Sequence, residues 1–480
     1  MRQEADPLMR VASGTPTLES PTRLTVPERQ ELGRSARTRL PRSSLANYAP
    51  ARDRPDPLAL LESQAATRVA ELVPIRYGRM LASPFSFYRG AALIMASDLA
   101  TEPHTELQVQ LCGDAHLSNF GLFASPERNL VFDIDDFDET LPGPWEWDIK
   151  RLLASLAVAG RSNGFDAPAC EHAVRAGAEG YRQQMHRLAA MRELDVWYAH
   201  TFVNRALEAG VDPTFGRQIR RTAAKARSRD HLQAQAKLTH VVDGHRQLAS
   251  DPPLLVPIHE LVGDAEAIAH ERQMSALMGT YVQSLEAHLR LLVSRFGYVG
   301  MARKVVGVGS VGTRAWIVLL LGRDDEDPLL MQVKEAQPSV LEGYLPPSGY
   351  SNAGQRVVIG QRRMQAASDI LLGWLHDVGP DGHECDYYVR QLRDWKGSAD
   401  VELMTPTVLA DYGRSCGEVL ARAHARTGDR IAIAAYLGKG DAADRALARF
   451  AATYADQNER DYEALRTAVE SGRVMAEYDL

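Results

Sequence analysis

Residues 112–148 read CGDAHLSNFGLFASPERNLVFDIDDFDETLPGPWEWD, and they hold most of the polar groups from which chemistry can be predicted. Apolar residues at 120–123 and 130–134 predict two strands, joined by a turn at Ser125-Pro126. Asp114 and Asn119 stand on the turn before the first strand. Acidic residues crowd the end of the second strand: Asp133, Asp135, Asp136, Asp138 and Glu139.

This acid cluster indicates a metal site. Neighbouring carboxylates repel one another unless a cation joins them, and Asp133 lies inside an apolar strand, where an unpaired carboxylate is costly. Phosphoryl transfer uses one carboxylate to orient the acceptor and take its proton, and an Asn and an Asp to hold magnesium, which prefers oxygen ligands. The alternative is that these acids cap helices or lie solvated in turns.

The loop 112–119 resembles the catalytic loop of kinases, in which an Asp precedes an Asn by five residues. It is more similar to that of small-molecule phosphotransferases of the aminoglycoside-kinase and choline-kinase type, which reads His-Gly-Asp-x-His-x-x-Asn. Cys112 stands here in place of the first histidine. The resemblance implies that Asp114 is the general base, or the group that orients the acceptor, and that Asn119 holds metal.

In those enzymes a second Asp precedes an aromatic residue or Leu on a strand, and a further Asp opens a helix twelve residues later. Asp136-Phe137 and Asp148 match this interval. The distance from Asn119 fits Asp133 better. We therefore predict Asp136 as the metal ligand and keep Asp133 as a second candidate or a second ligand.

A second motif is the glycine run Gly307, Gly309 and Gly312, followed by Lys334. A dinucleotide site would place a helix directly after the glycines, whereas residues 315–321 predict a strand. Strand, glycine loop and strand are typical of the kinase loop that covers the phosphates of ATP, and a lysine on the next strand holds those phosphates. The alternatives are a tight turn and a surface lysine.

The partner of this lysine stays open, because the helix predicted at 355–374 offers no Glu. The order of the motifs is also inverted, since kinases place the glycine loop before the catalytic loop. A circular permutation explains this order. The helix predicted at 408–426 supports it, because kinase-like enzymes carry such a helix just before the catalytic loop.

The chain from about residue 42 to 455 also resembles a bacterial family of unknown function, DUF2252, which is grouped with kinase-like proteins. The matching stretches are SPFSFYRGAA, CGDAHLSNFG, FDIDDFDETLPGPWEWDIKR, VGSVGTR, QVKEA and, just beyond, YADQNERDY. The resemblance implies a kinase-like fold, and it implies no substrate.

Bulk composition excludes several classes. A net charge of -7 argues against nucleic acid as the main partner. The chain has no run of eighteen apolar residues, so no membrane span is expected. The four cysteines form no CxxC pair, which argues against a zinc knuckle or a disulfide framework and favours a cytoplasmic setting.

We therefore predict an α+β, helix-rich, protein-kinase-like two-lobed fold in circularly permuted order. Residues 1–56 form a flexible Arg/Pro-rich arm, 57–300 a helical lobe with the catalytic and metal loops, 301–400 a strand-rich nucleotide lobe, and 401–480 helices that complete the helical lobe. The predicted function is ATP- and magnesium-dependent phosphoryl transfer to a small-molecule hydroxyl or amine. The alternatives are a regulatory pseudokinase and an enzyme that transfers AMP.

Overall fold

The computed structural model describes residues 24–201, 213–228, 236–242, 244–262, 264–305, 307–378, 383–392 and 395–478. The helices are α2 (Val26–Arg39), α3 (Pro57–Ala65), α4 (Val73–Met80), α5 (Pro84–Gly90), α6 (Ala92–Leu99), α7 (Trp145–Ser162), α8 (Ala167–Ala189), α9 (Glu193–Trp197), α11 (Pro213–Ser228), α13 (Ile258–Leu261), α14 (Asp264–Gln283), α15 (Ala287–Val293), α16 (Ala353–Met364), α17 (Pro406–Thr427), α18 (Arg430–Leu437) and α19 (Ala442–Glu470). The strands are β1 (Gln108–Leu111), β2 (Phe120–Ala124), β3 (Leu130–Ile134), β4 (Leu141–Pro144), β5 (Thr239–Val242), β6 (His245–Leu248), β7 (Leu255–Pro257), β8 (Gly297–Lys304), β9 (Ala315–Leu321), β10 (Pro328–Ala336), β11 (Gly373–Val378), β12 (Glu384–Gln391) and β13 (Gly397–Ser398).

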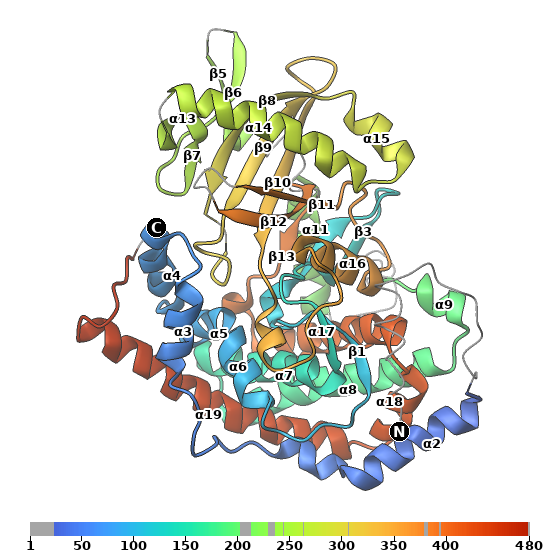
Figure 1. Ribbon diagram of the computed structural model, residues 1–480. Helices are drawn as coiled ribbons and strands as arrows, with labels where there is room; N and C mark the ends of the chain where they lie inside the picture. The colour runs from blue at the N-terminus through green and yellow to red at the C-terminus, as the bar shows by residue number, and fades with distance from the viewer. Residues whose placement is uncertain are drawn as a thin grey trace.

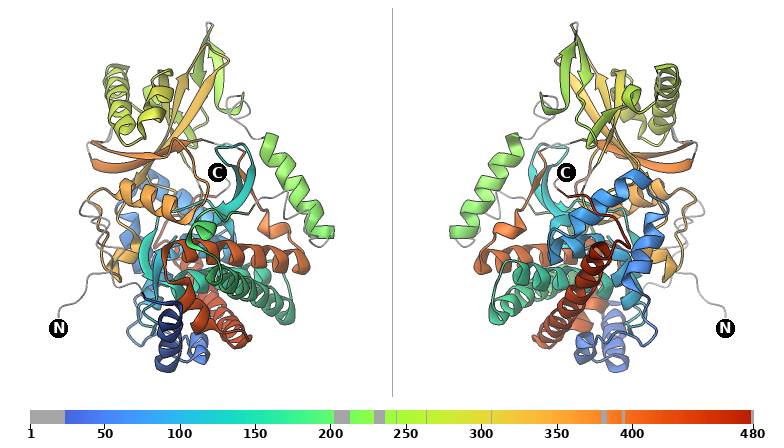
Figure 2. Two further views of the ribbon diagram at one scale, coloured as in Figure 1. Left: turned by 90° about the vertical axis from the view of Figure 1, so that its right-hand side faces the viewer. Right: turned by 90° about the vertical axis from the view of Figure 1, so that its left-hand side faces the viewer.

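The fold is mixed α+β with antiparallel sheets. The largest sheet has the strand order β11-β12-β10-β9-β8-β7, and all of its neighbours are antiparallel. Together with α13, α14 and α15 it forms the upper part of Figure 1, here called the sheet region, and α16 lies beneath the sheet. Below it lies the helical region, residues 24–201 and 395–478, which Figure 2 shows from two sides.

Strand alternation decides which side chains of the sheet face the helical region. On β9, Trp316 and Val318 pack with Tyr281 of α14 in one core, and the residues between them face the other way. The same alternation on β10 puts Met331 and Val333 in that core and leaves Gln332 and Lys334 on the opposite face. The sheet thus presents two polar side chains toward the lower part of the molecule.

The helical region is built on the pair α8 and α17, which run parallel and lie close together: Asn163, before α8, contacts Val401, before α17, and Leu188 at the other end of α8 contacts Arg430, just after α17. A Cβ on Gly417 would come within 2.2 Å of the carbonyl oxygen of Gly177, and one on Gly180 within 2.5 Å of that of Arg414. Only glycine permits this approach. Helices α7 and α19 pack on the pair and complete the largest hydrophobic core.

Several predicted elements are confirmed, and one helix is wrong. Strands 130–134 and 315–321 have the predicted bounds. The helix predicted at 355–374 ends at Met364 instead, and Trp374 lies in β11. The helix ends there because Gln365 takes an extended backbone conformation, and the side-chain amide of Gln365 donates to the carbonyl oxygen of Ile134 (2.6 Å).

The segment predicted as a flexible arm contains a packed helix. Helix α2 begins with a capping box between Thr25 and Glu28 and packs on α18. A Cβ on Gly33 would come within 2.1 Å of the carbonyl oxygen of Ala432. The arm prediction is therefore wrong for residues 24–56, and its first 23 residues lie outside the described ones.

The predicted boundary at residue 301 is too late, because β7 and β8 begin before it and α14 packs its apolar side chains on the sheet. The helices α17, α18 and α19 occupy the C-terminal segment. Among the described residues, no helix is long and apolar enough to cross a membrane.

Candidate functional site

The loop between β1 and β2 is held from below by Asp148, in the first turn of α7. This carboxylate accepts hydrogen bonds from the backbone N–H groups of Cys112 (2.8 Å) and Gly113 (3.0 Å). Gly113 has φ +85°, and a Cβ there would come within 2.2 Å of the carbonyl oxygen of Glu139. The loop therefore needs both the carboxylate beneath it and a glycine within it.

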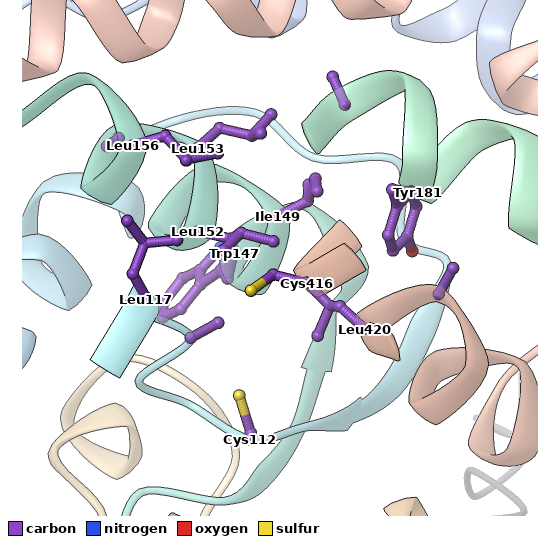
Figure 3. Packing of buried hydrophobic residues seen from close by; sticks show 14 of the residues in the cluster. Cys112, Leu117, Trp147, Ile149, Leu152, Leu153, Leu156, Tyr181, Cys416 and Leu420 are labelled. Atoms are coloured by element: carbon purple, nitrogen blue, oxygen red, sulfur yellow. The ribbon is translucent and has the colours of Figure 1, made fainter. Parts of the chain in front are cut away.

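A second layer of contacts fixes Asp148 in turn. Its carboxylate contacts Nε2 of His424 on α17 (3.1 Å), and Nδ1 of that ring lies 2.8 Å from the hydroxyl of Tyr181 on α8. Figure 3 shows the packing beneath the loop, where Cys112 and Leu117 lie among apolar side chains of α7 and α17. Cys112 and Leu117 thus anchor the loop in the largest hydrophobic core.

Asp114 lies on this loop in an ion pair. Its Oδ1 accepts from Nε of Arg151 (2.8 Å), and the Arg151 Nη2 donates to the carbonyl oxygen of Tyr88 (2.7 Å). Burial raises the pKa of Asp114 to about 6, although Arg151 opposes the rise. Asn119 donates from Nδ2 to the backbone carbonyl of Asp114 (2.8 Å), so the two predicted residues are neighbours in space.

The structure separates the five acids by their partners. Asp133 is buried in an ion pair with Arg422 of α17. Asp135 pairs with Lys396 (3.0 Å). Asp136 is the exception: among the described residues, no cation lies within ion-pair distance of it.

Lys334 finds its partner in this cluster rather than on a helix. Its Nζ pairs with Asp138, which also accepts from the hydroxyl of Tyr388 (2.8 Å) and from Ser310 of the glycine loop (3.3 Å). Burial would lower the pKa of Lys334, but the Asp138 carboxylate outweighs this and raises it. Helix α16 contributes Arg356, which donates to the backbone carbonyl of Asp138 (2.8 Å).

Two cavities meet at these residues. The first, of about 750 Å³, lies under the sheet and is lined by Lys334, Gln332 and Arg390. The second, of about 420 Å³, is lined by Asp114 and Asn119 of the loop between β1 and β2. Three residues line both: Asp136, Gly307 and Ser310.

The glycine run joins β8 to β9 above both cavities. Gly307 has φ +65° and its carbonyl oxygen accepts from Nη1 of Arg79 (2.7 Å). Gly309 lines the second cavity. Gly312, with φ +89°, lines neither, and its carbonyl oxygen accepts from the backbone N–H of Val69 (2.8 Å). Gly312 therefore connects the glycine run to the segment before α4 through a backbone hydrogen bond.

Most of the predicted site residues are therefore brought together, and two are not. The residues that line the joined cavities are Asp114, Asn119, Asp136, Gly307, Gly309 and Lys334. Asp133 faces Arg422 in the core and lines neither cavity, so its position argues against the metal role kept in reserve for it. Gly312 lies behind the glycine loop.

The metal prediction can be tested against the ligand set. Among the described residues, no group of three or more His, Cys, Asp or Glu side chains is placed to hold a metal ion by itself. Asp136 and Asn119 supply an unpaired carboxylate and an amide, and magnesium commonly uses few protein oxygens and completes its shell with phosphate and water. These two residues fit that mode and not an all-protein cage.

Sequence reasoning missed two features of the site. Kinase order places the ion-pair partner of Lys334 on a helix, whereas the structure pairs it with Asp138 of the acid cluster. The paired positions Gln332 and Arg390 also went unnoticed; they are opposite one another on β10 and β12, and Arg390 donates to Gln332 (2.9 Å). Each is a polar residue within an apolar strand, and this pattern in the sequence could have indicated a site.

The chain belongs to a bacterial protein family. The model of the family described as "Uncharacterized protein conserved in bacteria (DUF2252)" matches residues 68–468, which is most of the chain. No curated protein and no solved structure matches it.

Proposed function

We propose that this member of the DUF2252 family is an ATP- and magnesium-dependent phosphotransferase with a kinase-like, two-lobed fold in circularly permuted order. The observation that carries the proposal is the position of Asp136. It is a carboxylate without a cationic partner among the described residues, and it lies where the cavity of Lys334 meets the cavity of Asp114. A metal-bound phosphate at this junction would supply the missing charge.

The first cavity suits the nucleotide. Lys334 and the backbone of the glycine run lie along it, as a triphosphate requires. The Lys334–Asp138 pair would exchange with phosphate oxygens, because an anionic phosphate accepts charge-assisted hydrogen bonds from an ammonium as a carboxylate does. Its volume, about 750 Å³, lies in the range of nucleotide-sized ligands.

The second cavity suits the acceptor. The acceptor oxygen or nitrogen attacks the γ-phosphorus and forms the new bond, the bond from that phosphorus to the bridging oxygen breaks, and ADP leaves with the electron pair. Asp114 takes the proton of the attacking group. Magnesium held by Asn119 and Asp136 would neutralise charge on the phosphates. With a pKa of about 6, Asp114 is ionised at neutral pH and ready to act.

The contacts of α17 support the permutation. The C-terminal end of this helix lies beside β1, because the hydroxyl of Thr427 accepts from the backbone N–H of Gln110 (3.1 Å). Gly428 also lies against the carbonyl oxygen of Gln108, which a Cβ would approach to 2.6 Å. In kinase-like enzymes such a helix leads directly into the catalytic loop. Here the two segments are neighbours in space at opposite ends of the sequence.

Calorimetry of ATP binding, with and without magnesium, tests the proposal. We expect magnesium-dependent binding by the native protein, weakened at least about tenfold by Lys334→Ala and by Asp136→Asn. Lys439→Ala and Asp456→Asn, at exposed positions, are the matched controls and should leave the affinity within about twofold.

Absence of binding by the native protein at millimolar ATP would overturn the nucleotide assignment. Analysis of the products then separates the chemistries: ADP and a phosphorylated acceptor indicate phosphoryl transfer, and pyrophosphate indicates transfer of AMP. Magnesium-dependent binding without any product would favour the pseudokinase.

A further inference from the structure

The second cavity contains three arginines that the proposed chemistry does not use. Arg68 precedes η2 of the chain (Ala70–Leu72), Arg76 lies on α4 and Arg89 on α5, and all three line the cavity that also holds Asp114. They come from one stretch of the sequence, residues 68–89, which folds over the catalytic loop.

None of the three is in an ion pair with a carboxylate among the described residues. Arg76 is completely buried; its Nη2 donates to Gln64 (2.6 Å) and to the carbonyl oxygen of Gly90 (3.0 Å), whereas its Nε and Nη1 have no partner. The Nε of Arg68 and that of Arg89 are likewise buried without a hydrogen-bond partner. Three guanidinium groups thus have unused donors at one cavity.

The acids of the same cavity do not neutralise them. Asp114 is paired with Arg151, Asp138 with Lys334, and Glu335 with Arg314. The fourth, Glu139, accepts from the Ser339 hydroxyl (3.1 Å) and the backbone N–H of Val340 (2.7 Å). Asp136 is the member left for metal. The cavity therefore has more cationic than anionic groups available to a ligand.

A structural role explains only part of this arrangement. Arg68 donates from Nη1 to the carbonyl oxygen of Val311, and so it supports the glycine run. Arg76 makes no such contact with that run, and burying a guanidinium with two unpaired nitrogens is costly unless an anion joins it. Burial lowers the pKa of Arg76, and the neighbouring charge of Arg68 adds to this, as expected where like charges lack a counterion.

We propose that Arg68, Arg76 and Arg89 bind an anionic group of the acceptor, a carboxylate or a phosphate, and so hold its nucleophilic hydroxyl or amine at Asp114. This inference rests on the proposed function and narrows it to acceptors that are small anions. Guanidinium groups bind such oxyanions through paired N–H donors. A cavity of about 420 Å³ fits a metabolite and is too small for a folded protein segment.

Titration with inorganic phosphate, and separately with glycerate as the carboxylate probe, tests the inference by calorimetry. The variants are Arg89→Gln, Arg68→Gln and Arg76→Gln, with Arg466→Gln on the exposed face of α19 as the matched control. We expect at least about tenfold weaker binding of one probe in the three cavity variants and unchanged binding in the control. The probe affected tells phosphate from carboxylate.

Two comparisons keep the outcomes apart. Lys334→Ala should keep the anion affinity, and Arg76→Gln and Arg89→Gln should keep the affinity for ATP with magnesium within about twofold, because the two cavities hold different ligands. Arg68→Gln is left out of the ATP comparison, because Arg68 also supports the glycine run. Arg89, which is only half-buried, provides the result if Arg76→Gln fails to fold in a thermal melt.

The inference is overturned if the native protein binds neither probe, if the arginine variants bind them normally, or if Arg76→Gln and Arg89→Gln lose ATP binding instead. Failure of the native protein to bind ATP would overturn the phosphotransferase proposal alone, because the anion titration needs no nucleotide.

Discussion

The buried pair of Asp133 and Arg422 offers a direct test of which acids belong to the site. Both side chains are at most 3% exposed, and the guanidinium has two further nitrogens, Nε and Nη1, without a partner. In the substitution Asp133→Asn the shape is retained, but the arginine charge is left buried without a counterion. Breaking a pair of this kind costs about 3–5 kcal/mol.

The double variant Asp133→Val, Arg422→Met removes both charges, so it should recover most of the lost stability. Urea unfolding followed by tryptophan fluorescence measures these differences as shifts in midpoint at constant slope. Asp456→Asn, whose carboxylate is 55% exposed in its pair with Arg161, is the control and should cost less than about 1 kcal/mol.

The same proteins report on metal binding. If Asp133 is structural, Asp133→Asn measured below its melting temperature should bind ATP with magnesium as the native protein does. A destabilisation of less than about 1 kcal/mol, together with loss of the magnesium dependence, would refute the reasoning and return Asp133 to the metal site.

Two further predictions concern the loop between β1 and β2. Gly113→Ala should lower the free energy of unfolding by about 1–3 kcal/mol and reduce ATP turnover, measured as ADP release. The reason is that Gly113 has φ +85° and that a Cβ there would collide with the Glu139 carbonyl. Gly164 has φ +76° and open space around it, so Gly164→Ala is the control that measures backbone strain without a collision. The rate of ADP release should also fall about tenfold for each pH unit below pH 6 and level off above pH 6. Asp114 must be ionised to accept a proton, and burial raises its pKa to about 6. A rate that does not change through pH 6 would exclude Asp114 as the base.

Local patterns were enough to predict the elements that carry the site. The strand at 315–321 is a continuous apolar run bounded by polar turns, and the structure gives it the same limits. The spacing of Asp114 and Asn119 placed both on one loop, where they share a hydrogen bond. These features depend on residues close in sequence, which is why the sequence alone reveals them.

Features that depend on distant residues were not accessible in this way. Asp133 and Asp136 look equivalent in the sequence, but only the fold brings Arg422 of α17 against the first and leaves the second at a cavity. The strongly polar sequence of α2 predicts an arm rather than a packed helix. The glycine that lets it approach α18 shows its use only when both helices are present.

The loop between β1 and β2 illustrates why the order of segments in the chain matters less than their contacts in the fold. The group beneath it, Asp148, follows it in sequence, and the histidine that supports Asp148 lies 276 residues further on. Because the loop is held by these side chains and by the packing of α17 on β1, it would keep its shape whether α17 preceded it or followed it in the chain. The proposed permuted order is therefore compatible with these contacts, because each of them joins segments that are neighbours in the fold, whatever their order in the chain.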